Sequence, residues 1–123
     1  MMERNVIAYD LGTGGVKASI YNGEGQELGF AFEAYDTYYP HNGWHEQKPE
    51  EWWNAVVRST KKLMDESGVD AATIEALAIS GHSLGVIPIG KDGALLREAT
   101  PIWSDTRATA QAARFFEKVS HEK

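Results

Sequence analysis

Cysteine is absent from this 123-residue chain, which excludes disulfides, thiolate nucleophiles and zinc–thiolate sites. This absence fits the reducing cytoplasm, which is the location we expect. Long apolar runs are also lacking, because no stretch reaches the roughly 20 apolar residues of a membrane span. The N-terminal stretch MMERNVIAYDLG has no apolar core of a signal peptide. Positive charge is scarce, since 12 Lys and Arg stand against 18 Asp and Glu, giving a net charge of −6. We therefore expect neither a membrane nor a nucleic-acid partner.

The residues that are present indicate one globular α/β domain. Hydrophobic residues make up 42% and charged residues 24% of the chain, a balance that supports a core at this length. Apolar alternation and turn signals predict an initial antiparallel meander, and three- and four-residue apolar spacing predicts two helices. The expected elements are strands at 6–10, 16–22 and 27–35, a helix at about 49–67, strands at 74–80 and 85–90, and a helix from about 106.

This β-β-β-α-β-β-α order predicts a mixed sheet with helices packed on it. Because IEALAIS at 74–80 is almost wholly apolar, we expect it to be a central strand. Trp52 and Trp53 are expected in the core. The last helix is expected to bury an inner face formed by Ala108, Ala112, Phe115, Phe116 and Val119.

The pattern Gly-x-Ser-x-Gly occurs at Gly81–Gly85, where it raises the question of a serine nucleophile at Ser83. A nucleophile elbow requires a helix directly after the serine turn. The following VIPIGKDG is β-branched, contains proline and ends in a turn, so it disfavours a helix. The acid and histidine partners should follow, but the only later histidine is His121. The hydrolase interpretation is therefore disfavoured, and a glycine-rich turn at a strand end is expected.

A second glycine-rich segment, DLGTGGVK from Asp10 to Lys17, lies between two expected strands. The Rossmann and Walker loops both lead into a helix, so neither applies. A hairpin can still bind phosphate, because glycines allow close approach and positive φ, and consecutive N–H groups form an anion nest. Thr13 offers a hydroxyl, Lys17 a cation, and Asp10 a ligand for Mg²⁺, directly or through water. An ordinary glycine turn, with Asp10 as a turn residue, is the alternative.

The pattern Asp-x-Gly-Thr-x-x-x-Lys at the start of a hairpin resembles the first phosphate motif of the ribonuclease H-like, actin-like ATPase fold. Within that fold, the chain resembles the FGGY carbohydrate kinases, particularly xylulokinase-like members. WHEQKPEEWWNAV is similar to a Trp-x-Glu-Gln-x-Pro-x-x-Trp-Trp stretch of that family, and PIWSDTR is similar to its Trp-x-Asp-x-Arg. The resemblance covers almost all of residues 1–123 and identifies them as part of an FGGY N-terminal domain.

The resemblance implies a kinase that transfers a phosphoryl group from MgATP to a sugar in a cleft between two domains. The residues expected at the ATP phosphates and Mg²⁺ are Asp10, Gly12, Thr13, Gly14, Gly15 and Lys17. The residues expected at the sugar are His82, Ser83, Leu84, Trp103, Asp105 and Arg107. Trp103 would present an apolar face, while Asp105 and Arg107 would contact the sugar or brace the loop. For each of these three residues a purely structural role is the alternative.

The chain departs from the family in two ways. Xylulokinases typically carry Met-His or Gln-His before the glycine at position 85, whereas this chain has Ser83 and Leu84. The sugar therefore stays open between a ketose such as xylulose and a related polyol. The family's general base, an aspartate, and its adenosine-binding half lie beyond the position of Lys123, so we expect the chain alone to be inactive. Its expected partners are sugar, ATP and the missing C-terminal kinase domain, with a homodimer as a further arrangement. The alternative function is a non-catalytic actin-like fragment that acts through a protein partner.

Overall fold

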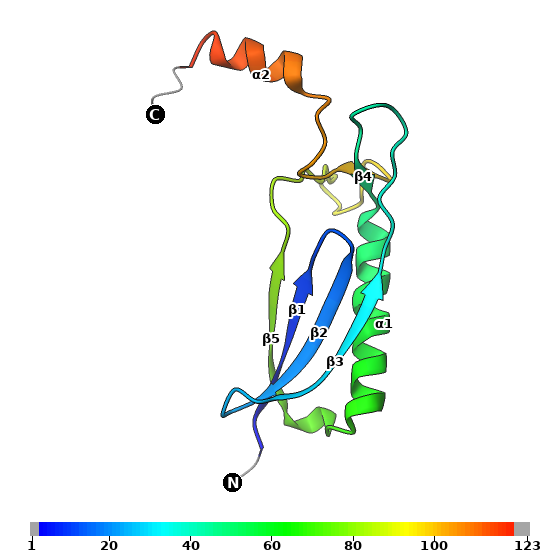
Figure 1. Cartoon of the computed structure of the whole chain (residues 1–123), viewed down its shortest axis with the longest axis vertical. Coiled ribbons are helices and arrows are strands. Elements are labelled where there is room, and N and C mark those ends of the chain that lie inside the picture. Colours follow the sequence, from blue (N-terminus) through cyan, green and yellow to red (C-terminus); the bar gives the residue numbers. More distant parts are fainter. Residues whose placement is uncertain (1–2, 120–123) are drawn as a thin grey trace.

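The computed structural model describes residues 3–119, so His121 lies outside the described residues. Three antiparallel strands open the chain and form the expected meander: β1 (Asn5–Leu11), β2 (Gly15–Asn22) and β3 (Glu27–Ala34). Strand β5 (Ile74–Gly81) then pairs parallel to β1, which gives a mixed sheet of order β3-β2-β1-β5 (Figure 1). The predicted mixed α/β sheet is confirmed.

Helix α1 (Pro49–Ser67) packs along one face of this sheet, as predicted. Proline at its start, two glutamates in its first turn and Gly68 with φ 65° after its end give the helix clear boundaries. The core lies between α1 and the meander, where apolar residues alternate along each strand. Its buried members are Ile7, Tyr9, Val16, Ala18, Ile20, Ala31, Tyr35, Ala55 and Leu63.

One expected core residue of α1 faces solvent. Trp52 is partly buried against the core, but Trp53 is 66% exposed. Successive helical residues are about 100° apart, so neighbouring tryptophans cannot both point at the same sheet. The expectation for Trp53 was therefore wrong.

The expectation of a central strand at 74–80 was also wrong, because β5 is an edge strand of the described sheet. Leu77 and Ile79 are 63% and 75% exposed. They align with Ile7 and Tyr9 of β1, so they lie on the α1 side of the sheet but beyond the area that α1 covers. An apolar run predicts that a strand prefers burial, whereas its position depends on what pairs beside it.

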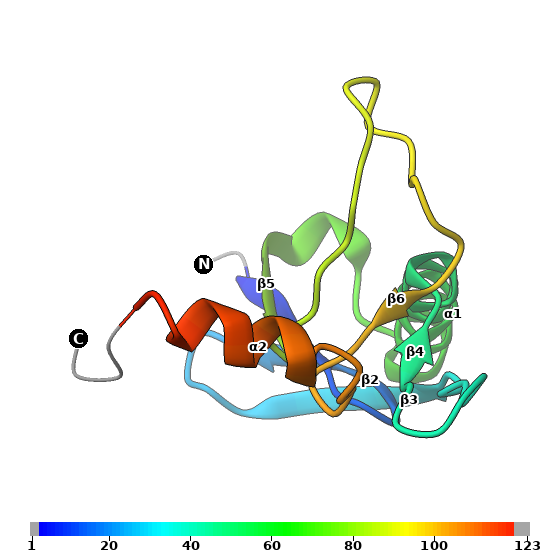
Figure 2. The same cartoon turned by 90° about the horizontal axis from the view of Figure 1, so that it is seen from above.

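The segment after β5 differs from the expected strand at 85–90. Within 82–99 the structure has turns and an isolated bridge between Ile89 and Leu95, and Figure 2 shows this excursion extending away from the body of the molecule. Pro88 and the Gly90–Gly93 turn interrupt the backbone pairing that a longer strand would need. The strand after β5 is instead β6 (Thr100–Pro101), which pairs with β4 (Glu46–Gln47) outside the main sheet.

Helix α2 (Thr109–Phe116) begins three residues later than predicted and buries no inner face. Figure 1 shows it beyond the end of the sheet, and Phe115 and Val119 are 57% and 40% exposed. The apolar spacing marks a face that could pack, but no layer of the described chain reaches it. In residues 3–119, no helix combines the length and apolar character needed to cross a membrane.

Candidate functional site

The glycine hairpin, Gly12–Gly15, joins β1 to β2 at one end of the sheet, and each of its carbonyl groups accepts a hydrogen bond. The Tyr35 hydroxyl donates to the Gly12 carbonyl, and Gln47 Nε2 donates to the Thr13 carbonyl at 2.6 Å. The Gly14 carbonyl accepts from the Tyr35 N–H at 3.4 Å, and Gly15 accepts from the Gly12 N–H at 2.9 Å. The hairpin carbonyls are thus engaged by the protein itself.

Unlike the carbonyls, the N–H groups at the tip of the glycine hairpin are not hydrogen-bonded within the described chain. Within residues 3–119, neither the Thr13 nor the Gly14 N–H has a hydrogen-bond acceptor. Gly14 is exposed, and a Cβ atom added there would meet nothing within 4 Å. Two adjacent free donors at an exposed glycine are suited to an anion, because an oxyanion accepts bonds from several N–H groups.

The expected positive φ in this hairpin is not observed. Among the described glycines, those with positive φ are Gly25, Gly43, Gly68 and Gly93, all outside the hairpin. Glycine at position 15 is needed for space instead, because an added Cβ would lie 2.5 Å from both the Glu33 carbonyl oxygen and Phe32 Cζ. The direction of the N–H groups therefore comes from bonds to the carbonyls rather than from left-handed backbone.

The two charged residues that flank the hairpin lie differently. Asp10 is exposed at the end of β1, and its charge adds to the burial that raises the pKa of Tyr35 to about 12. Tyr35 therefore stays a hydroxyl donor at neutral pH. Lys17 is cross-strand partner of Asp10, but its ammonium group lies 3.4 Å from Glu27 Oε1 and 5.0 Å above the Phe30 ring. The structure thus brings Asp10 near the hairpin and directs Lys17 along β3, in an exposed ion pair that is weak enough to rearrange.

The Ser83 turn, residues 82–85, follows β5 at the same end of the sheet. The His82 N–H donates to the Leu11 carbonyl at 3.0 Å, which ties the turn to the end of β1. The His82 ring meets Trp52 edge-on with centroids 5.5 Å apart, and its buried Nδ1 has no partner among the described residues. Ser83 is exposed, and Leu84 is 83% exposed with φ 66°. No helix follows the turn, which removes the nucleophile-elbow geometry for Ser83.

Trp103, in the PIWSDTR motif, links that motif to the glycine hairpin. Its Nε1 donates to Thr13 Oγ1 at 2.9 Å, while 54% of the residue stays exposed. Because the Thr13 oxygen accepts this bond, its own hydrogen remains available to donate to a ligand. The glycine hairpin, the Ser83 turn and Trp103 therefore gather at one end of the sheet.

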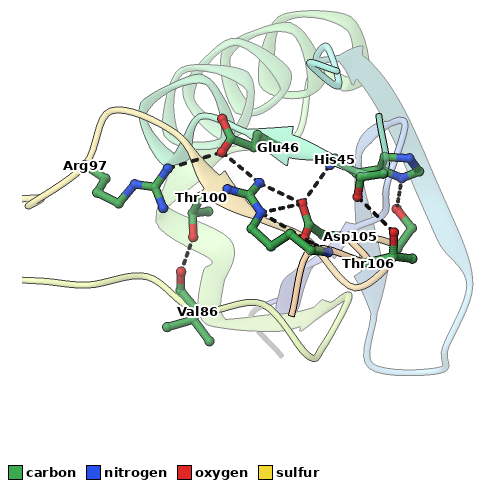
Figure 3. Close-up of polar contacts among 10 residues, drawn as sticks. His45, Glu46, Val86, Arg97, Thr100, Asp105 and Thr106 are labelled. Atoms are coloured by element: carbon green, nitrogen blue, oxygen red, sulfur yellow. Dashed lines mark hydrogen bonds and ion pairs between the residues drawn. The ribbon is translucent and has the colours of Figure 1, made fainter. Parts of the chain in front are cut away.

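Asp105 and Arg107 brace the loop that carries Trp103. Arg107 Nε donates to both Asp105 carboxylate oxygens, at 2.9 and 3.0 Å, and its Nη2 lies 2.8 Å from Glu46 Oε1. The Asp105 Oδ2 also accepts from the His45 N–H at 2.8 Å, and Figure 3 shows this contact beside Glu46. The Arg107 guanidinium stacks over the Trp44 ring with Cζ 3.8 Å from the centroid. The alternative of a bracing role is the arrangement that the structure shows.

The electrostatics of this brace are balanced. Arg97 Nη2 lies 3.2 Å from Glu46 Oε1, so two acidic and two basic groups share the network. The hydrogen bonds from Arg107 hold the pKa of the Asp105 carboxyl well below its usual range, while burial opposes this shift. The Asp105 and Arg107 side chains are only 5% and 19% exposed. The brace thus keeps its charges at neutral pH and leaves little of either side chain for a ligand.

Sequence reasoning missed the three residues that hold these loops: Tyr35, Glu46 and Gln47. Glu46 and Gln47 lie in the WHEQ stretch, where they contributed to a resemblance but received no role. Both are buried, Gln47 completely. A buried amide or carboxylate needs partners, so polar residues beside a proline-started helix were the available signal.

The residues present fit the phosphate groups of a nucleotide better than a preformed metal site. Two N–H groups without an acceptor and the Thr13 hydroxyl lie together at the hairpin tip, where the exposed Gly14 leaves room for phosphate oxygens. No cluster of three metal-ligating residues occurs in residues 3–119, so Asp10 stands as a single exposed carboxylate. A Mg²⁺ ion held by one carboxylate, waters and substrate phosphates is compatible with that arrangement.

Comparison with known proteins places the chain in a family. Residues 5–123 match the model described as the FGGY family of carbohydrate kinases, N-terminal domain. The chain is 34% identical over 113 residues to a xylulose kinase of Bacillus subtilis (strain 168), covering 92% of this chain and 22% of that protein. It is 27% identical over 121 residues to a glycerol kinase of Trichodesmium erythraeum (strain IMS101), covering 98% of this chain and 24% of that protein.

A solved structure agrees with these relatives. The chain superposes on the structure titled a xyloylose kinase from Brucella ovis with a TM-score of 0.88 and 29% identity, covering 93% of this chain and 24% of the other. The chain thus spans less than a quarter of the length of the proteins it matches. Its mixed sheet is the actin-like sheet of sugar kinases, and the chain belongs to the FGGY family of carbohydrate kinases.

Proposed function

We propose that the whole protein containing this chain is a cytoplasmic sugar kinase that transfers the terminal phosphoryl group of MgATP to a ketose such as xylulose or to a related polyol. Residues 1–123 form part of its N-terminal domain, with the phosphate hairpin and part of the sugar wall. Xylulose and glycerol kinases among the relatives support this substrate class.

The observation that carries the proposal is the one-sided hydrogen bonding of the glycine hairpin. All four carbonyls are engaged by the protein, whereas the Thr13 and Gly14 N–H groups have no acceptor among residues 3–119, and a Cβ at Gly14 would meet nothing within 4 Å. In an ordinary turn, the carbonyls at the tip would face water as readily as the N–H groups. Donors held ready for an anion stabilise phosphoryl transfer because they need no reorientation when charge develops.

The chain's own residues divide the work between phosphate and sugar. The Thr13 and Gly14 N–H groups and the Thr13 hydroxyl bind phosphate oxygens, with Gly12 and Gly15 shaping the hairpin and Lys17 turning from Glu27 to the phosphates. Asp10 orients Mg²⁺, directly or through water, and the bound metal neutralises phosphate charge. Trp103 presents its ring to the sugar, while Ser83 donates or accepts a hydroxyl bond.

The roles of the remaining predicted residues are less direct. His82 offers its unpartnered Nδ1 from beside Trp52, and Leu84 supplies apolar contact. Asp105 and Arg107 act mainly through the position of Trp103. Proton removal from the sugar hydroxyl requires a base outside this chain, so the 123-residue chain alone does not catalyse transfer. The uncovered Leu77 and Ile79 supply surface for the rest of the domain to pack against.

A coupled assay of ADP release tests the proposal on the whole protein. We expect turnover that depends on a sugar or polyol, with xylulose and glycerol as first substrates. Asp10→Ala should lower turnover about 10²–10³-fold, since it removes an electrostatic contact made mainly in the transition state. Asp65→Ala is the matched control, because Asp65 is exposed near the far end of α1 and should leave turnover unchanged.

Three results would contradict parts of the proposal. Normal turnover and an unchanged Mg²⁺ requirement in Asp10→Ala would remove Asp10 from the phosphate site. Absence of turnover with every sugar and polyol, together with absence of MgADP binding, would favour the non-catalytic alternative. Robust turnover by the isolated 123-residue chain would show that the base lies within it.

A further inference from the structure

We infer that Gln47 is a positioning residue, which sets the direction of the Gly14 N–H by holding the Thr13 carbonyl from behind. The consequence for nucleotide binding rests on the proposed function, but the positioning itself does not. No role for Gln47 follows from the motifs, as it touches neither the open side of the hairpin nor the Ser83 turn.

The orientation of the Gln47 amide is fixed by its neighbours. Trp52 Nε1 lies 2.9 Å from Gln47 Oε1, and an indole nitrogen can only donate. The amide nitrogen must therefore face the Thr13 carbonyl at 2.6 Å, which can only accept, and Thr37 Oγ1 at 2.8 Å. Both N–H donors are thus used, and the O and N atoms cannot exchange places without breaking these bonds.

Peptide geometry transmits this bond to the open side of the hairpin. In a planar trans peptide, the carbonyl of one residue and the N–H of the next point in opposite directions. Because Gln47 binds the Thr13 carbonyl, the Gly14 N–H of the same peptide is directed away from Gln47. The Tyr35 hydroxyl on the Gly12 carbonyl directs the Thr13 N–H in the same manner.

Because Gln47 is buried, the bond to the Thr13 carbonyl requires a hydrogen-bond donor at position 47. Gln47 is 0% exposed, so water cannot replace a lost partner of the Thr13 carbonyl. A glutamate at this position would match the shape of glutamine and still accept from Trp52. It would, however, set a carboxylate oxygen against the Thr13 carbonyl, and the peptide would turn to avoid two facing acceptors.

The test compares Gln47→Glu with Gln111→Glu in the whole protein, labelled with ¹⁵N at glycine and tryptophan. Gln111 is exposed in α2, so its variant carries the same charge change without the buried contact. For Gln47→Glu, we expect the order parameter of the Gly14 amide to fall from about 0.85 to below about 0.6. The Trp52 indole signal should keep its hydrogen-bonded position, and the Kd for MgADP should rise about tenfold.

A second variant keeps the test decisive if the buried carboxylate prevents folding. Gln47→Met removes the donors without burying a charge, and it also removes the acceptor of Trp52. It should loosen the Gly14 amide as well and, in addition, shift the Trp52 indole signal. The control Gln111→Glu should change none of these readouts.

The outcomes separate this inference from the proposed function. An unchanged Gly14 order parameter in folded Gln47→Glu or Gln47→Met would overturn the positioning role. A mobile Gly14 with an unchanged Kd for MgADP would overturn its consequence for binding. If the unsubstituted protein does not bind MgADP but Gly14 still loses order in the variants, the proposed function fails while the positioning role of Gln47 is supported.

Discussion

The glycine hairpin and the Ser83 turn lie at the same end of the sheet, but the chain holds them in very different ways. Every carbonyl of the hairpin is engaged, and its holders Tyr35 and Gln47 are buried. The Ser83 turn has one backbone bond to β1, through His82, and its outward residue Leu84 is 83% exposed in a left-handed conformation. The glycine hairpin is therefore held by residues of the described chain, whereas the Ser83 turn has few such contacts.

This difference fits the separate ligands proposed for the two loops, phosphate at the hairpin and the sugar at the Ser83 turn. Under the proposed function, the nucleotide phosphates are the same whichever sugar is phosphorylated, so a loop that binds them can be fixed once by a local core. The sugar varies between relatives, and a turn that awaits further contacts can change its residues at little cost to that core. We therefore expect substitutions at the buried positions of the hairpin to affect stability strongly and substitutions at the turn to affect it weakly.

The largest expected effect comes from Gly15, and its neighbour Gly14 provides the comparison. Gly15→Ala should lower the free energy of unfolding by about 3 kcal/mol, because the new Cβ meets the Glu33 carbonyl oxygen at 2.5 Å and strands β2 and β3 must separate. Gly14→Ala is the matched control and should change it by less than about 0.5 kcal/mol, since its Cβ meets nothing within 4 Å. Urea denaturation measures the free energy of unfolding of both variants. A Gly15→Ala effect as small as that of Gly14→Ala would show that the hairpin is not tightly packed.

An intermediate effect is expected at the brace of the Trp103 loop. Asp105→Asn should lower the free energy of unfolding by about 1.5–3 kcal/mol at pH 7, the usual size for hydrogen bonds to charged groups. The pKa of Asp105 is lowered in the folded state, so its contribution is present above the unfolded pKa of about 3.9 and is lost as the pH falls further. The difference from the unsubstituted protein should therefore shrink below about pH 4.

Thermal unfolding between pH 3 and pH 7 measures this effect, with Asp65→Asn as control because Asp65 is exposed and makes no ion pair among those described. A difference that stays constant over this range would show that the Asp105 charge is not what stabilises the brace. A difference confined to the Trp103 fluorescence would show that the brace positions the loop without stabilising the fold.

The elements that the sequence predicted well are those whose partners are close in the chain. The meander and α1 follow from alternation, turn residues and a proline-started helix, and the core that they form with each other lies mostly within residues 5–67. The hairpin was predicted from its glycines, but the reason differs. Gly15 is required because a Cβ atom would not fit there, not because its φ is positive. Local patterns report such local requirements directly.

The elements that the sequence predicted poorly depend on partners that are distant or outside the described chain. The apolar pattern of β5 and α2 signals a demand for burial but not which element meets it, so a central strand and an inner helix face were expected where Leu77 and Phe115 are exposed. Gln47 was missed for a related reason. Its partners Thr13 and Trp52 are identified only when the hairpin is folded back over the start of α1.

The smallest expected effect tests whether the Ser83 turn is as unconstrained as its contacts suggest. Leu84 adopts φ 66°, which costs a non-glycine residue roughly 1–2 kcal/mol. Leu84→Gly removes this cost but adds backbone entropy of about 0.4–1 kcal/mol to the unfolded chain. We therefore expect a net stabilisation of about 0.5 kcal/mol, measured as a higher urea midpoint with an unchanged m-value. Leu84→Ala keeps the left-handed backbone and should have almost no effect, since the side chain it shortens is already in water. If Leu84→Ala instead destabilised the whole protein by more than about 1 kcal/mol, the leucine would be packed there against residues outside this chain, and the contrast with the glycine hairpin would hold only for residues 3–119.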